Sequence, residues 1–302
     1  MIGNRYEFVM LFDVENGNPN GDPDAGNAPR VDAETGYGYI TDVCLKRKIR
    51  NYVELVKDGE AGYNILIKAD RSLNSKFDDA YKAENLKKGD ADDVKIARAY
   101  MCKNYFDVRA FGAVMSTGDH PCGIVRGPVQ INFARSISPV NIQDITITRQ
   151  ARTTEDRMET GSTEMGKKSM IPYALYRAEG YVSAALAKKV TDLTEEDLTL
   201  LWQAIINMFE EDHSAARGKM CMRKLIVFKH ENILGNCPSH LLFDKVKVEE
   251  AAAPPRSIQD YSISIDRDMP EGVTCYFVTS SNGELVPIDK AMPEGVTLIE
   301  KL

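Results

Sequence analysis

The stretch from Arg5 to Tyr52 constrains the fold of this chain more than any other. The pattern predicts a strand at Arg5–Val14, a loop almost without apolar residues at Glu15–Ala28, and a basic helix at Asp42–Val56. The loop is built from Gly, Pro, Asn and Asp, which favour turns for separate physical reasons, so it cannot be a helix or a central strand. A polar loop beside a basic helix indicates a localised site for an anion.

The helix predicted at Asp42–Val56 has Thr41 or Asp42 as its N-cap. Its apolar residues recur at helical spacing and form one buried stripe. Lys46 and Arg50 are four residues apart and flank this stripe, whereas Arg47 points away from it and is expected to be solvated.

Composition and charge limit the possible functions. The chain has 302 residues, of which 43% are hydrophobic, so it can bury a sizeable core. The net charge of −7 argues against indiscriminate nucleic-acid binding, but a local basic face is still allowed. One such region is His213–His230, with five Lys or Arg and no acid.

The six cysteines are scattered, without a Cys-x-x-Cys pair, which favours reduced, buried thiols in a cytosol over a zinc site or a disulfide scaffold. The sequence contains no signal pattern and no apolar run long enough for a membrane span. We therefore expect a cytoplasmic protein without a membrane partner.

The middle of the chain is expected to carry two additions to the sheet. Residues 57–105 form a helical insertion, with helices predicted at Lys76–Lys87 and Asp92–Tyr105. Strand character follows at Val129–Ile147. Arg149–Ser169 then loses almost all apolar residues and is expected to be a long protruding loop or hairpin, because loops of this length are usually functional or disordered.

The second half returns to regular structure. We predict strands at Tyr173–Leu186 and Leu225–Lys229, and between them an amphipathic helix at Thr194–Glu211 capped by Thr194. Lys247–Tyr261 has a linker composition, within C-terminal strands at 247–302. The hexapeptide Met-Pro-Glu-Gly-Val-Thr, first present at Met269–Thr274, occurs again at residues 292–297, and is interpreted as a reused turn before a strand.

Two motifs resemble known ligand loops but fail in detail. Gly161–Lys168 approaches a nucleotide-binding P-loop, but Lys168 stands where Ser or Thr must bind Mg²⁺, and the segment leads into a strand rather than a helix. Asn16–Asn27 approaches a calcium loop, but it lacks the first Asp and the final bidentate Glu. We therefore predict no cofactor and no metal.

Several segments together resemble one family. Phe12–Asp24, Thr41–Arg50, Asp107–Gly112, Gly127–Gln130 and Gly166–Tyr173 are similar, in this order, to the backbone subunit of the CRISPR Cascade complex, subtype I-C, of the repeat-associated RRM-like superfamily. The resemblance covers most of the chain and is less distinctive over the last ~100 residues. It implies a protein that polymerises along guide RNA and has no catalysis of its own.

The expected fold is α+β: a single domain, 1–302, with an elaborated RRM-like (ferredoxin-like) core of antiparallel sheet. To this core are added the polar loop or hairpin at 15–40, the helical insertion at 57–105 and a long thumb-like loop at 149–169. The expected partners are the CRISPR guide RNA, the target DNA strand through the guide, further copies of the chain and other Cascade subunits.

The expected RNA contacts come from the polar loop, the basic helix, a segment around a possible stacking aromatic, and the long loop. The residues are Asn18, Asn20, Lys46, Arg47, Arg50, Arg109, Phe111, Arg149, Arg152, Arg157, Met158, Met165, Lys167 and Lys168. For Phe111 the alternative interpretation, an ordinary core residue, is slightly favoured.

Two alternatives remain open. One is a metal-dependent endoribonuclease of the same fold, because relatives in other CRISPR subtypes cut RNA with a loop aspartate and carboxylates occur near Asp13 and Asp22–Asp24. The other is a structural oligomer without RNA, whose basic helix docks on an acidic neighbour such as the Glu195–Asp197 face.

Overall fold

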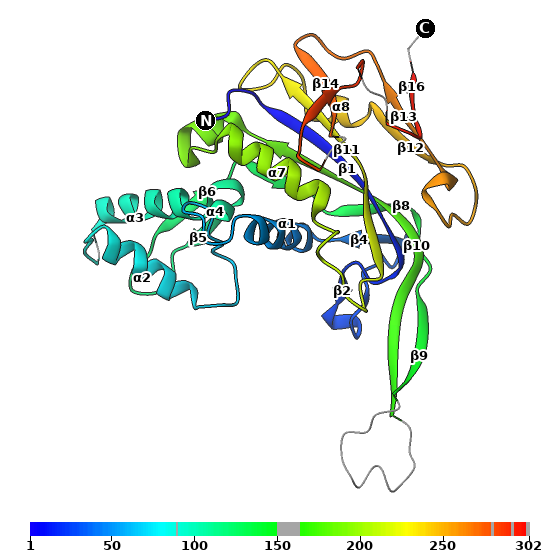
Figure 1. Ribbon diagram of the computed structural model, residues 1–302, viewed down its shortest axis with the longest axis horizontal. Helices are drawn as coiled ribbons and strands as arrows, with labels where there is room; N and C mark the ends of the chain where they lie inside the picture. Colours follow the sequence, from blue (N-terminus) through cyan, green and yellow to red (C-terminus); the bar gives the residue numbers. More distant parts are fainter. Residues whose placement is uncertain (89, 150–163, 279–280, 291–292, 300–302) are drawn as a thin grey trace, which may run out of the picture.

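The computed structural model describes residues 1–88, 90–149, 164–278, 281–290 and 293–299. Within these ranges the central element is a nine-stranded sheet whose strand pairs are all antiparallel (Figure 1). Its main path runs β15 (Leu285–Pro287), β14 (Val273–Val278), β11 (Lys219–His230), β1 (Tyr6–Gly17), β10 (Glu164–Val182), β8 (Ala134–Pro139) and β4 (Tyr37–Ile40). β7 (Val129–Ile131) and β9 (Gln143–Arg149) also pair with β10.

Strand β1 lies at the centre of this sheet and separates two cores. Phe8, Met10 and Phe12 face one core, whereas Val9 and Leu11 face the other. All five side chains are fully buried. This alternation follows from the strand geometry, in which successive side chains point to opposite faces. The predicted strand at Arg5–Val14 is confirmed and extends to Gly17.

Two long helices cover the first face of the sheet. α1 (Asp42–Val56) begins at Thr41, whose hydroxyl accepts from the Cys44 N–H, and α7 (Glu195–Asn207) begins with a capping box between Thr194 and Asp197. The predicted N-cap Thr194 is confirmed, and of the two candidates Thr41 and Asp42 the structure has Thr41 as the cap. Shorter helical segments lie on the same side: α4 (Phe106–Phe111), α6 (Ala184–Leu186) and the π-helical turn η2 (Ala187–Thr191).

The C-terminal segment covers the opposite face of the sheet (Figure 1). It contains α8 (Ser239–Phe243), β12 (Val246–Glu250), η3 (Ile258–Asp260), β13 (Tyr261–Asp266) and β16 (Val296–Ile299). The prediction of a linker over Lys247–Tyr261 is therefore wrong at its start. Val246 is buried and Val248 partly buried in an alternating strand, which pairs with β13.

A separate lobe carries the third core. It contains α2 (Leu73–Ala83), α3 (Ala91–Asn104) and the hairpin of β5 (Gly112–Met115) with β6 (Gly123–Arg126). The first predicted helix was placed three residues late, because Ser72 caps α2. The hairpin belongs to this lobe because Met115 and Val125 are buried in the same core.

The polar loop and the long hairpin lie at one end of the sheet (Figure 1). The loop contains β2 (Gly21–Asp22), η1 (Pro23–Ala25) and β3 (Ala28–Pro29). β9 and the first part of β10 form a hairpin that projects from the body, so the residues from Glu164 to Ser169 are strand rather than loop. The strand expected to begin at Tyr173 therefore starts nine residues earlier.

Candidate nucleic-acid interface

The polar loop is held against the connection between α7 and β11. A Cβ atom at Gly17 would lie 1.7 Å from the carbonyl oxygen of Arg217, and Gly218 has a φ of +69°. The N–H of Asn18 donates to the carbonyl of Ala216 over 2.9 Å. Because only glycine permits this approach, the sequence Asn-Gly in the loop and Arg-Gly before β11 determine one ordered surface.

The two loop asparagines predicted to contact RNA are engaged inside the protein. The Asn20 side-chain oxygen accepts from both the N–H and the hydroxyl of Thr41, at 3.0 and 3.1 Å, and so ties the loop to the start of α1. The Asn18 amide donates to the carbonyl of Asn27 over 2.7 Å. The Asn18 side-chain oxygen is buried and has no partner within the described residues. These side chains shape the loop.

The basic residues of α1 are largely occupied. Arg50 is buried and donates from Nε to Asp107 over 2.9 Å, which corrects its assignment as a phosphate contact. Arg47 was expected to be solvated, but its guanidinium donates to the carbonyl of Ile67 over 2.6 Å. Lys46 lies 3.0 Å from Asp42 and 3.4 Å from Gln130, so part of its donor capacity remains open at the helix flank.

Arg109 and Phe111 are also buried, so neither can contact a ligand at the surface. The Arg109 guanidinium binds both carboxylate oxygens of Asp197, at 2.7 and 2.9 Å, and three backbone carbonyls. Phe111 is 6% exposed and lies under Lys46 and Arg50. Of the two interpretations of Phe111, the ordinary core residue is the correct one.

The hairpin residues predicted to contact RNA differ in their structural surroundings. Lys167 is exposed, and the Lys168 ammonium donates to the carbonyl of Ala215, which links the hairpin to the connection before β11. Arg149 and Met165 lie in the paired strands. Arg152, Arg157 and Met158 lie outside the described residues. Lys167 and Lys168 also stand in a strand, which is incompatible with a nucleotide-binding P-loop.

Further cations at this end of the sheet were not singled out as contacts from the sequence. Lys219 is 64% exposed and lies 3.5 Å from Glu15, and Arg217 pairs with Asp212. The signal was the acid-free run from His213 to His230, but its strand and turn residues could not be separated without the register of β11. Arg217, Lys219, Lys167 and Lys168 are referred to below as the basic end.

An aromatic surface lies beside the polar loop, on β4 and β8. The rings of Tyr39 and Phe133 are stacked with centroids 6.3 Å apart, and the Arg135 guanidinium lies 4.9 Å from the ring centroid of Tyr37. Phe133 is 56% exposed. The surface lines an open apolar cavity of about 620 Å³. Aromatic faces beside cations are typical of single-strand binding surfaces.

The carboxylates considered for a metal have other partners. Asp13 is buried and accepts from the Tyr173 hydroxyl and the Arg223 Nε, both over 2.8 Å. Burial and the Asp13 carboxylate raise the pKa of Tyr173. Asp22 caps η1 and lies 3.4 Å from Arg30. Among the described residues, no group of three or more His, Cys, Asp or Glu is arranged to hold a metal ion.

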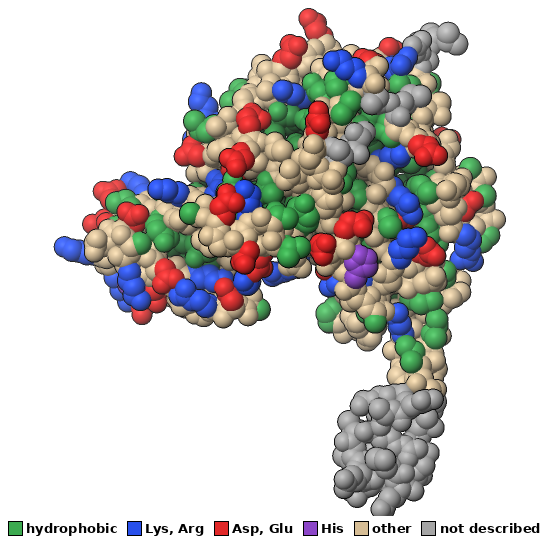
Figure 2. All heavy atoms as spheres, in the orientation of Figure 1, with side chains coloured by type: hydrophobic (Ala, Val, Ile, Leu, Met, Phe, Trp, Pro, Cys, Tyr) green, Lys and Arg blue, Asp and Glu red, His purple; other side chains and the backbone are tan. Residues whose placement is uncertain are grey.

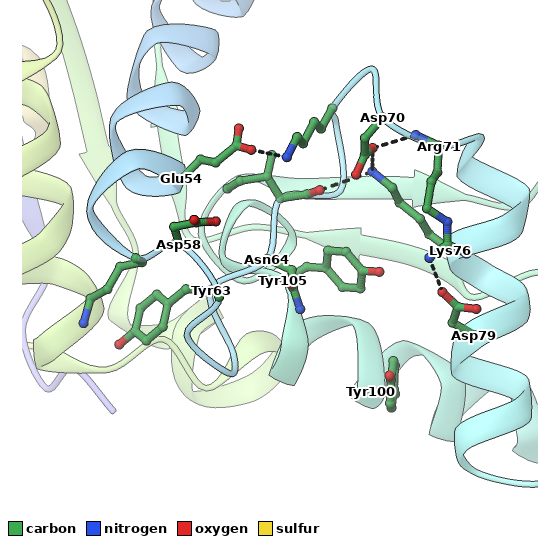
Figure 3. A pocket seen from close by; sticks show the side chains of 14 residues that line it. Glu54, Asp58, Tyr63, Asn64, Asp70, Arg71, Lys76, Asp79, Tyr100 and Tyr105 are labelled. Carbon is green, nitrogen blue, oxygen red and sulfur yellow. Dashed lines mark hydrogen bonds and ion pairs between the residues drawn. The ribbon is translucent and has the colours of Figure 1, made fainter. Parts of the chain in front are cut away.

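A polar pocket of about 290 Å³ separates the end of α1 from the helical lobe (Figure 3). Its charged side chains pair with one another: Asp70 with Lys76 over 2.7 Å, and Arg71 with Asp79 over 2.8 Å. Lys76 also donates to the carbonyls of Ile65 and Leu66. Lys68 pairs with Glu54 of α1, which joins the lobe to this helix, and the paired charges leave little charge free for a ligand. On the face of the lobe seen in Figure 2, cations and anions are interspersed.

No helix in the described part of the chain is long and apolar enough to span a membrane. Residues 4–266 match the family model for CRISPR-associated protein Cas7. The CRISPR-associated protein Cas7 of Haloferax volcanii is 27% identical over 290 residues, which cover 87% of this chain and 81% of that protein.

Two solved chains are similar in structure at lower levels. One, from a CRISPR RNA-guided surveillance complex described as pre-nicking, has a TM-score of 0.49 and 15% identity, and the match covers 74% of this chain and 75% of that chain. The other, from a CRISPR RNA-guided surveillance complex, has a TM-score of 0.43 and 13% identity, over 73% and 68% of the two chains. Because the family model spans most of the sequence, this chain belongs to the Cas7 family of CRISPR-associated proteins.

Proposed function

We propose that this chain is the guide-RNA-binding backbone subunit of a subtype I-C Cascade surveillance complex in the cytoplasm. In this proposal it polymerises along the CRISPR RNA, meets the target DNA strand through the guide, and contacts other Cascade subunits and further copies of itself without catalysis. Membership of the Cas7 family supports the proposal. The observation that carries the RNA interface is the basic end, where an ordered polar loop meets a projecting hairpin with exposed Lys167.

We also propose that the core is an elaborated RRM-like domain. Strands β11, β1, β10 and β8 lie in that order, with α1 between β1 and β8 in sequence and α7 between β10 and β11. This is the order of the ferredoxin-like βαββαβ arrangement. An RRM uses the open face of its sheet to stack bases. Here the C-terminal segment covers that face, so the proposed RNA path runs along the end of the sheet.

Recognition in this proposal is largely independent of sequence. The basic end offers lysine and arginine side chains, which contact phosphates, and phosphate contacts position a strand without reading its bases. One subunit can therefore occupy successive segments of any guide. The aromatic surface of Tyr39 and Phe133 adds stacking, which every base tolerates.

The test is the salt dependence of single-stranded RNA binding by the variant Lys167→Ala/Lys219→Ala. Each phosphate contact contributes about 0.7 to the slope of log affinity against log salt. Loss of two contacts is expected to lower this slope by ~1.4 and to weaken all RNA sequences alike. Fluorescence anisotropy at several salt concentrations measures both quantities.

The matched control is Lys88→Ala/Lys95→Ala, which removes the same charge from the helical lobe, where both lysines are more than 60% exposed. Its slope is expected to equal that of the wild type. If the two double variants had the same salt slope, the basic end would not be part of the RNA interface. The same RNA, incubated with Mg²⁺ and run on a denaturing gel, is expected to stay intact; metal-dependent cleavage would favour the endoribonuclease.

A further inference from the structure

A further cavity lies between β11 and the C-terminal segment, on the covered face of the sheet. Its volume is about 530 Å³, within the range of ligand-binding pockets. Four segments line it: β11 with Met222, Arg223 and Lys224, η3 with Ile258 and Gln259, β13 with Tyr261 and Ile263, and the residues Glu294 and Gly295 before β16.

A β-bulge places two consecutive cations on the same face of β11. Leu11 pairs with Lys224 and Phe12 pairs with Met222, so Arg223 is the extra residue. In a regular strand Arg223 and Lys224 would point to opposite faces. Here Arg223 reaches Asp13, on the face that the C-terminal segment covers, and Lys224 reaches the carbonyl of Glu294. Bulges commonly re-aim side chains at functional sites.

Both cations keep donors available. Arg223 is bonded through Nε to Asp13 over 2.8 Å, and no other nitrogen of its guanidinium has a hydrogen bond within the described ranges. The side chain is 31% exposed. The Lys224 ammonium donates to a backbone carbonyl. Burial lowers the pKa of Lys224, and Arg223 lowers it slightly further, whereas Glu294 raises it.

Apart from the exposed Glu294, whose carboxylate raises the pKa of Lys224, the remaining walls are apolar or neutral. Ile263 is buried, Ile258 is partly buried, and Tyr261 presents a ring whose hydroxyl lies 3.4 Å from that of Ser138. Met222 borders the cavity, but it packs against the core on the helix-covered face. Gln259 is exposed and offers an amide at the rim. An apolar floor beside an arginine and a lysine suits a flat apolar ring that carries a nearby phosphate.

We propose that this cavity binds one nucleotide unit, with its base on the apolar floor and its phosphate at Arg223 and Lys224. The inference rests on the proposed function only for the source of the nucleotide. Lys219 lies on the same strand as the two cations and belongs to the basic end, so a single strand bound there can continue into the cavity. A free nucleotide has the same chemistry, and the experiment separates the two sources.

The experiment compares Lys224→Met with Lys247→Met in the full-length protein. Lys224→Met removes a cation without leaving the Asp13 carboxylate unpaired, because Asp13 binds Arg223 instead. Lys247 is exposed on β12 and serves as the control with the same charge change. Isothermal titration with uridine 5′-monophosphate, uridine and inorganic phosphate measures binding at the cavity, and the salt slope of single-stranded RNA binding is measured in parallel.

We expect uridine 5′-monophosphate to bind the wild type and Lys247→Met alike, and Lys224→Met ~10-fold more weakly, as for the loss of one charge-assisted hydrogen bond. Uridine and inorganic phosphate alone are expected to bind more weakly than the nucleotide. An RNA salt slope lowered by about 0.7 in Lys224→Met assigns the site to a strand. An unchanged slope with weakened nucleotide binding assigns it to free nucleotides.

Two results would overturn the proposal. One is equal binding of the nucleotide to Lys224→Met and Lys247→Met, or no binding to either protein. The other is inorganic phosphate binding as tightly as the nucleotide, which would leave no role for the apolar floor. Neither result bears on the proposed RNA interface, which the Lys167 and Lys219 variant tests separately.

Discussion

At the scale of single residues, two buried ion pairs join the layers of the molecule. Arg50 of α1 binds Asp107 of α4, and Arg109 of α4 binds Asp197 of α7. Asp107 also accepts from the N–H groups of Leu66 and Ile67. Each buried charge therefore has a partner, and Asp107, Arg109 and Asp197 each take part in several hydrogen bonds, which is the condition under which charged groups are tolerated in a core.

The Arg109 pair leads to a stability prediction. Arg109→Leu leaves the Asp197 carboxylate buried beside two donors of Thr194 but without its cation, and is expected to lower the free energy of unfolding by about 3–5 kcal/mol. Urea unfolding measures the change. Arg126→Leu, at an exposed position, should change it by less than about 0.5 kcal/mol. Similar values for the two variants would mean that the pair does not stabilise the fold.

Asp70 in the pocket of Figure 3 leads to a pH prediction. The hydrogen bond from Lys76 lowers the pKa of Asp70 from 3.8 to about 2. Because the folded pKa is below the unfolded value, this contribution to stability is present above pH 3.8 and is lost as the pH falls to about 2. The effect is modest, since the Asp70 side chain is 38% exposed.

In urea unfolding from pH 5 to pH 2, the stability difference between the wild type and Asp70→Asn is expected to shrink over this window. Glu84→Gln, at an exposed residue of the same lobe, is the control. A difference between the wild type and Asp70→Asn that stays constant with pH would contradict the assigned shift.

At the scale of elements, the β9–β10 hairpin contributes little to the cores. The described side chains of β9 are exposed, including Ile145 and Ile147 at 39% and 49%. An element that projects without burying its apolar residues gains no stability from them in the single chain. Its two exposed isoleucines and Lys167 are available for the assembly contacts proposed above.

The corresponding prediction is a shortened hairpin. Asp144 and Ser169 are directly paired, so residues 145–168 can be replaced by an Asn-Gly turn that joins them. The thermal midpoint is expected to stay within a few degrees, because no described core residue is removed, whereas long RNA-bound assemblies should be lost. Size-exclusion chromatography with RNA that spans several subunits checks the assemblies. Assemblies like those of the wild type would contradict a role of the hairpin in assembly along RNA, and an unfolded variant would show that the segment supports the core.

The repeated turn shows how local sequence determines local structure. In the first copy the N–H of Val273 donates to the carbonyl of Pro270, with Gly272 at a φ of +74°. In the second copy the N–H of Val296 donates to the carbonyl of Pro293 in the same way, with Gly295 at +77°. The interpretation as a turn before a strand is correct for the described part of each copy.

At the scale of the whole molecule, the sheet is a shared wall between two cores. Val9, Leu175 and Phe228 pack against the C-terminal segment, whereas neighbouring residues of the same strands pack against α1 and α7. Two layers that share every central strand cannot separate without exposing both faces of the sheet. We therefore expect them to unfold as one unit.

The single tryptophan tests this expectation. Trp202 lies on the helix face, 5.3 Å from Phe8 between ring centroids, and Ile265 lies fully buried on the opposite face. Ile265→Ala is expected to cost about 2–5 kcal/mol and to shift the urea midpoint seen by tryptophan fluorescence as much as that seen by circular dichroism. Ser262→Ala, at an exposed position, is the control. A shift in circular dichroism alone would show that the C-terminal layer unfolds separately.

The sequence by itself determined the features that depend on local spacing. The strand at β1, the limits of α1, the cap at Thr194 and the reused turn follow from periodicity and from the conformations of particular residues. Only the tertiary structure decided which charged residues are free. Arg50 and Lys46 are one helical turn apart, yet the first is buried against Asp107 and the second keeps an open donor.

The same holds for Arg109, whose partner Asp197 is 88 residues away in sequence. The bulge at Arg223 and the aromatic surface of Tyr39 and Phe133 likewise depend on how strands pair. A charge or an aromatic ring has the same local signature whether it is buried or exposed. Its role depends on groups that folding brings from elsewhere in the chain, and no local pattern contains that information.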